Sequence, residues 1–213
     1  MGLTKPWITP YAGERYEGRF GFDGQQIFYA PGEGEPRDDD GILWQPSLGR
    51  CQHPGCRMTV DQHDRWEAGH EIDLGEIWWK EMHTGRQRDA MRGPLCQVCG
   101  TNLSEAKPLL WLLPALELMV RKPNGRPFTT STPPICATCV DVARQQCPNL
   151  KANAPLLLQV QHYRPWGVFG DTVRTRPVQR LVQGDVQLGT EEIKRTMARH
   201  LVVEILDYRK VRS

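Results

Sequence analysis

Two Cys-x-x-Cys pairs constrain the fold of this chain more than any other feature of its sequence. The first pair is Cys96 and Cys99, and the second is Cys136 and Cys139. Two cysteines separated by two residues can direct both sulfurs toward one metal ion, and two such pairs complete the four-thiolate tetrahedron typical of structural zinc. The sequence therefore predicts that zinc, bound by these four residues, organises the middle of the chain.

The residues around both pairs support this prediction. Cys99 is followed by Gly100, which tolerates the backbone geometry of a tight knuckle. The second pair lies where a helix is expected to begin, and a helix amino terminus favours thiolate. That helix is expected to end near Cys147, because Pro148 follows. A knuckle, intervening strands and a ligand-bearing helix together form the pattern of a treble clef.

Other interpretations of the cysteines stay open at this point. The four residues could be buried as small apolar side chains, or they could be redox motifs, although neither pair has a thioredoxin-like strand–motif–helix context. Cys147 is not expected to be a fifth ligand. Eight helical residues separate it from Cys139, a rise of about 12 Å, whereas each zinc–sulfur bond measures about 2.3 Å. We expect Cys147 to pack in the core.

A second group of metal-binding residue types precedes the first pair. Cys51 and Cys56 have an acceptable ligand spacing, and His63 and His70 could complete a separate zinc site. The alternative is that these are surface histidines and unligated thiols in a loop.

Composition indicates a soluble globular protein. The chain has 213 residues, of which 39% are hydrophobic and 24% charged. Its net charge of +2 gives little support to nucleic-acid binding through overall charge. Residues 172–213 are locally basic, with nine Lys or Arg against five Asp or Glu, and could contact an acidic partner or form a solvated face.

The sequence predicts a cytoplasmic protein with no membrane partner. No secretory leader is recognised, and the longest apolar run is too short to span a bilayer. Thiols stay reduced in the cytoplasm, which suits metal binding by cysteine.

The expected fold class is α+β, with a treble-clef zinc core, short β-hairpins and a C-terminal amphipathic helix. Four segments are expected: a β-rich segment 1–49, a Cys/His-rich insertion 50–75, a zinc domain 76–153, and a hairpin plus helix 154–213. The hairpin is expected to turn at Gly184. The helix is expected to begin after Thr190, because apolar residues then recur at every fourth position. These residues are Ile193, Met197, Leu201 and Ile205. Residues 121–134 are expected to form a long loop.

Part of the sequence resembles the skeleton of HNH nucleases. The resemblance is carried by the spacing of Cys51 and Cys56, by the segment Gly69–Asp73, and by the segment Gly93–Cys99. In that family, cysteine pairs hold zinc and a central histidine activates water beside a divalent metal. The resemblance implies that His70 would be this general base. Gly69 stands where the family usually has an acidic residue.

A second resemblance covers more of the chain, about residues 41–170. The segments Gly41–Trp44, Leu95–Cys99, Leu110–Leu113 and Pro133–Cys139 resemble small actinobacterial (streptomycete) treble-clef proteins that are mostly called hypothetical or phage-related. This resemblance implies zinc at the later two cysteine pairs and brings no known activity.

The sequence thus predicts a structural-zinc module that binds or adapts an unknown protein partner or nucleic acid. A binding role is favoured over an enzymatic one, which stays open. Two alternatives stay open: a divergent HNH-like, metal-dependent nuclease, and a nucleic-acid-binding regulator that uses the basic C-terminal helix. No dinucleotide-binding, P-loop, serine-hydrolase or zincin motif is present in the sequence.

Overall fold

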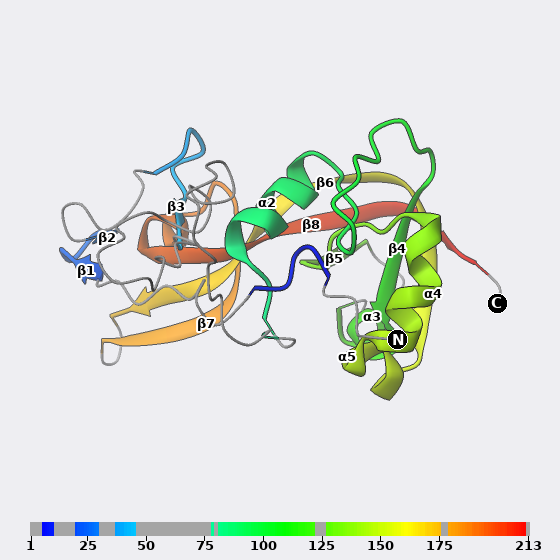
Figure 1. Ribbon diagram of the computed structural model, residues 1–213. Coiled ribbons are helices and arrows are strands. Elements are labelled where there is room, and N and C mark those ends of the chain that lie inside the picture. Colours follow the sequence, from blue (N-terminus) through cyan, green and yellow to red (C-terminus); the bar gives the residue numbers. More distant parts are fainter. Residues whose placement is uncertain are drawn as a thin grey trace, which may run out of the picture.

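The structure is a computed structural model that describes residues 6–10, 20–29, 37–45, 78, 81–121, 127–175 and 179–211. Two long antiparallel strands run through most of the molecule (Figure 1). These are β6 (Pro155–Arg174) and β8 (Thr196–Lys210). The described part contains both helices and strands and is mostly sheet, as the α+β prediction requires.

Strands β6 and β8 each pair with different neighbouring strands along their length. On β6, the first half pairs with β4 (Leu109–Pro114) and the second half with β7 (Arg180–Gln187), both antiparallel. On β8, β3 (Leu43–Trp44) pairs in parallel near the start, and β5 (Phe128–Thr130) pairs antiparallel further along. The six strands therefore form one sheet in which β6 and β8 are the central strands.

The remaining described elements are short. They are the hairpin β1 (Phe20–Phe22) and β2 (Ile27–Tyr29), the helices α2 (Thr84–Arg92), α3 (Ala115–Arg121), α4 (Ala137–Gln146) and α5 (Pro148–Ala152), and the 3₁₀ helix η3 (Glu191–Arg195). Helices α4 and α5 lie together beside β4 at one end of the sheet (Figure 1).

Glycines allow the strands to approach closely at irregular points of the sheet. The register between β6 and β8 shifts before Gly167 and again before Gly170. A Cβ at Gly167 would collide with the carbonyl oxygen of Val186 on β7, and one at Gly170 with that of Met197 on β8. These positions therefore require glycine for steric reasons.

The predicted C-terminal helix is wrong. Thr190 precedes only the short helix η3, and the chain then extends as β8. A spacing of four residues equals two full periods of a strand as well as about one turn of a helix, so the apolar pattern fits both. Val202 and Val203 are β-branched and fully buried, which favours the strand. The basic surface that the regulator alternative assigned to this helix is therefore on a strand.

Two smaller predictions are also wrong. The chain does not turn at Gly184, because β7 continues through it and Gly184 lies opposite Gly170 in the sheet. The segment predicted as a loop from residue 121 to 134 contains β5, which completes one edge of the sheet. Glycine can occur inside a strand, as Gly184 does in β7, and the prolines of the second segment flank β5 without interrupting it.

A buried glutamine joins α2 to the sheet. Gln87 has no exposed surface, and its amide contacts β8 at Leu201, between the stretches of β8 that pair with β3 and β5. The amide oxygen accepts from the Leu201 backbone N–H at 2.8 Å. The amide nitrogen donates to the carbonyls of Leu201 at 2.9 Å and Ser131 at 2.7 Å. Gln87 thus takes the place of a strand neighbour on the side of β8 opposite β6, at a position where neither β3 nor β5 pairs with β8.

We expect acid to destabilise the fold through His200. Its ring stacks on Phe169, with centroids 5.7 Å apart. Burial, reinforced by the charge of Arg199, lowers the pKa of His200 to about 4 and outweighs a hydrogen bond to the backbone of Met82. The folded-state pKa lies below the unfolded value of about 6.5, so above about pH 6.5 the ring is neutral in both states and the free energy of unfolding is not reduced. As the pH falls toward 4, the unfolded state binds a proton that the folded state does not, and the free energy of unfolding decreases.

The contribution of His200 to the free energy of unfolding should fall by about 3 kcal/mol over that range. Denaturant unfolding of the wild type and His200→Phe at about pH 7 and about pH 4.5 measures it, because the other acid-sensitive groups are common to both proteins. Equal losses of stability in the two proteins would show that His200 does not carry the effect.

Candidate metal centre

The first cysteine pair lies on a tight knuckle. The Cys96 N–H donates to the carbonyl of Thr101 at 2.8 Å, and the Gly100 N–H donates to the carbonyl of Cys96 at 2.8 Å. Gly100 has a φ of 72°, in the left-handed region that favours glycine. A bridge between Leu95 and Asn102 closes the knuckle. The backbone therefore holds both sulfurs of this pair on one side of a turn.

The second pair lies at the beginning of α4. Cys136 is the N-cap residue, and Cys139 lies in the first turn, where its N–H donates to the Cys136 carbonyl at 3.1 Å. The Cys136 N–H also donates to the sulfur of Cys96 at 3.3 Å. One hydrogen bond thus joins the two pairs directly.

The four sulfurs form one compact cluster. The Sγ atoms of Cys96, Cys99, Cys136 and Cys139 all lie within 4.8 Å of one another. The Sγ atoms of Cys99 and Cys136 are 3.8 Å apart. Zinc–sulfur bonds of about 2.3 Å at tetrahedral angles place neighbouring sulfurs about 3.8 Å apart. All four cysteines are free thiols, so the cluster could hold one metal ion.

Burial opposes the ionisation of three thiols of the cluster, Cys96, Cys99 and Cys139. Burial raises the pKa of Cys96, and burial together with the neighbouring Cys136 thiol raises that of Cys139. Burial also opposes ionisation of Cys99, but hydrogen bonds with Thr101 outweigh it and lower the pKa of Cys99 to about 6. A divalent cation at the centre would favour the charged form of every thiol, so its binding would release protons.

Two threonines contact the sulfurs, and sequence analysis missed both. The hydroxyl of Thr101 lies 3.1 Å from the sulfur of Cys99, and that of Thr138 lies 3.1 Å from the sulfur of Cys136. Each threonine follows its cysteine by two residues, so the repeated Cys-x-Thr pattern was an available signal. These hydroxyls can donate to thiolate and stabilise its charge.

A segment near the beginning of the chain covers the knuckle. The backbone N–H groups of Trp7 and Ile8 donate to the carbonyls of Val98 and Gln97, at 2.8 and 3.2 Å. The Trp7 ring lies against Gly100, where a Cβ would come within 3.3 Å of it. No local pattern in the sequence indicated this contact, because it joins residues about ninety positions apart.

Cys147 stands outside the cluster, as predicted. It caps α5 immediately after α4 ends at Gln146, and it packs against the main core. Among the described residues, the metal-binding group consists of the other four cysteines alone.

The second predicted zinc site lies outside the described residues. This holds for Cys51, Cys56, His63 and His70, and therefore also for the general base of the HNH interpretation. Both remain predictions from the sequence.

Comparison of the chain with models of protein families, with curated proteins and with solved structures finds no match. In the part of the chain that the structure describes, no helix has the length and apolar character needed to cross a membrane.

Proposed function

We propose that this chain is a structural-zinc protein of the treble-clef type that acts as a binding or adaptor module. The observation that carries the proposal is the cluster of four cysteine sulfurs within 4.8 Å of one another. It is supported by their origin, two from a knuckle and two from the beginning of α4, with β4 between them in the sequence.

Zinc suits this donor set better than calcium or magnesium does. Four thiolates at tetrahedral spacing select soft or borderline metals, and calcium and magnesium prefer oxygen ligands. Four protein ligands leave no coordination position for a water molecule, so the metal would be structural and not catalytic. Reduced thiols suit the cytoplasm, where we place the protein.

An adaptor role follows from what the ion would join. The knuckle is bonded to the Trp7 segment, and the second pair begins α4. One ion would therefore fix three segments that are distant in the sequence and keep their surfaces in a constant arrangement. We propose that such a surface binds a protein partner or a nucleic acid.

Native mass spectrometry of the purified chain tests the metal directly. We expect one zinc ion at the cluster, with release of protons on binding. The double variant Cys96→Ser/Cys136→Ser should bind one zinc fewer than the wild type. The matched variant Cys51→Ser/Cys56→Ser should retain the ion at the cluster, whether or not a second site exists. Iron in place of zinc, or no metal difference between the wild type and Cys96→Ser/Cys136→Ser, would contradict the proposal.

A further inference from the structure

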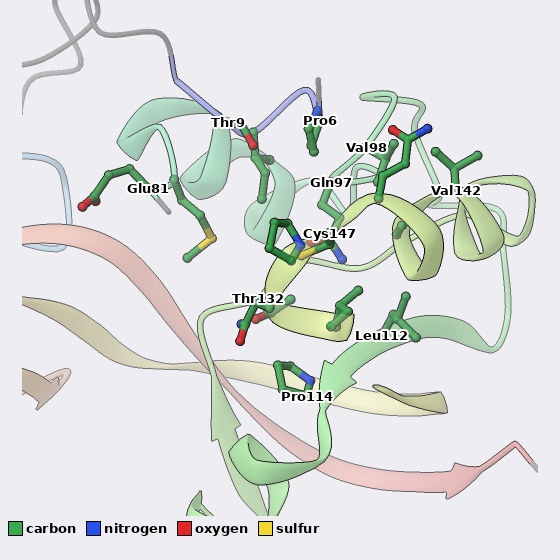
Figure 2. A pocket seen from close by; sticks show the side chains of 17 residues that line it. Pro6, Thr9, Glu81, Gln97, Val98, Leu112, Pro114, Thr132, Val142 and Cys147 are labelled. Carbon is green, nitrogen blue, oxygen red and sulfur yellow. The ribbon is translucent and has the colours of Figure 1, made fainter. Parts of the chain in front are cut away.

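A cavity of about 650 Å³ is lined in part by Gln97 and Val98, which lie between the two cysteines of the knuckle. Figure 2 shows the side chains around this cavity. Its walls come from the knuckle, from α4 and α5, from β4, and from the segment around Ile8. Pockets that bind drug-sized molecules usually measure about 300–1,000 Å³. The cavity therefore has the size of a binding site for a small molecule.

Most of the lining is apolar. Ten of the 17 lining residues are apolar, among them Ile8, Val98, Leu112, Val142 and Leu150. Leu112 from β4 and Leu150 from α5 are buried in the wall, and Val142 on α4 is partly exposed to the cavity side. A hydrocarbon body placed here would lose its contact with water, which favours binding roughly in proportion to the buried area.

Charged side chains are rare among the described residues that line the cavity. Among the described lining residues, Glu81 alone is charged, and it is exposed to solvent. Figure 2 shows Glu81 at one side of the cavity, away from Val142 and Leu112. Among the described lining residues an anionic ligand would find no cationic side chain, and Glu81 would repel it, whereas an ammonium group near the mouth would be attracted.

The cavity is built by the same segments that form the metal centre. Gln97 and Val98 lie between the two ligands of the knuckle, and Val142 and Ala143 follow Cys139 on α4. The hydrogen bonds that hold the knuckle therefore also hold this wall in place. Such preorganised walls bind a ligand at a lower entropic cost than mobile ones.

We propose that this cavity binds a small, mostly apolar primary amine. The hydrocarbon body lies against Leu112, Val142 and Leu150, and the ammonium group lies at the mouth near Glu81. This binding goes beyond the structural role of the metal and does not depend on which ion occupies the cluster.

Calorimetric titration of the full chain with decylamine, decanol and decanoate tests the proposal. We expect saturable binding of one decylamine per chain, weaker binding of decanol, and the weakest binding for decanoate. Glu81→Gln should weaken decylamine binding about threefold and leave decanol unchanged, because an exposed carboxylate contributes modestly. No saturable binding of decylamine, or decanoate binding as tightly as decylamine, would overturn the proposal.

Filling the cavity locates the binding site. Val142→Trp should weaken decylamine binding at least about tenfold, because the larger side chain occupies the space of the ligand. Gln145→Trp is the matched control, since Gln145 is exposed on the same helix and is not in the lining. Ala143→Leu fills the adjacent position more mildly and replaces Val142→Trp if that variant is not folded by circular dichroism. Unchanged affinity in the folded filling variant would overturn the assignment.

Cys147 provides an independent readout, because its thiol is free and lines the cavity. Iodoacetamide should modify Cys147 more slowly when decylamine is bound, as measured by mass spectrometry of the peptide that contains it. In the control variant Gln145→Trp, bound decylamine should slow the modification of Cys147 by the same factor. Equal rates with and without decylamine would contradict binding at this place.

Discussion

Replacing Cys96 by serine is expected to abolish metal binding at the cluster and, with it, cooperative folding. Cys96 is fully buried, and its sulfur accepts a hydrogen bond from the backbone N–H of Cys136 in the other cysteine pair. Structural zinc binds with an apparent free energy of about 10–16 kcal/mol in zinc-finger peptides. That is comparable to the total stability of a typical domain, about 5–15 kcal/mol, so we expect the fold not to survive the loss of the ion.

Thermal unfolding followed by circular dichroism measures this effect. Cys147→Ser is the matched control, because it makes the same chemical change at a partly buried cysteine outside the cluster. We expect the control to keep its zinc and a cooperative transition, with a loss of about 1 kcal/mol. A metal-free Cys96→Ser protein that unfolds cooperatively at the wild-type temperature would show that the cluster does not support the fold.

Gln87→Leu is expected to destabilise the chain by about 3–5 kcal/mol, because the change leaves several buried backbone groups without a hydrogen-bond partner. Gln87 has no exposed surface and makes three hydrogen bonds to the backbone of Leu201 and Ser131. Leucine has a similar volume, so the loss reports mainly on these hydrogen bonds. Denaturant unfolding at neutral pH measures the change in free energy, and Gln145→Leu on exposed α4 surface should change it by less than about 0.5 kcal/mol.

Gln87→Glu separates the hydrogen bonds from the packing. A carboxylate can still accept from the Leu201 N–H, but it cannot donate to the carbonyls of Leu201 and Ser131. At neutral pH this variant should be at least as unstable as Gln87→Leu, and it should recover relative to it as the pH falls, because a protonated carboxyl can donate once. A Gln87→Glu protein as stable as the wild type at neutral pH would contradict this account. Zinc content should be unchanged in both variants if they remain folded.

Local chemistry made the candidate site predictable. Two Cys-x-x-Cys pairs have few uses in a chain with reduced thiols, and the position of Pro148 limits the helix that follows the second pair. The structure brings all four cysteines together and begins α4 at Ala137, next to Cys136. These features depend on residues close in sequence, which is why pattern reading reaches them.

The secondary structure of residues 196–210 could not be predicted from local sequence in the same way. Met197, Leu201 and Ile205 have a spacing that suits a helix and a strand equally, and only pairing with β6 decides between them. Two further contacts also join distant residues: the ring of Trp7 packs against Gly100 of the knuckle, and Gln87 is hydrogen-bonded to Leu201 of β8. Neither contact leaves a local signal.

The amino-acid sequence alone determined which side chains could hold a metal and where the helix that carries two of them begins and ends, because spacing and proline act within a few residues. The tertiary structure alone decided that residues 196–210 are a strand, that β3 to β8 form one sheet, and that a cavity lies beside the cysteines. These outcomes depend on which distant segments bury each other's apolar surface and satisfy each other's backbone hydrogen bonds.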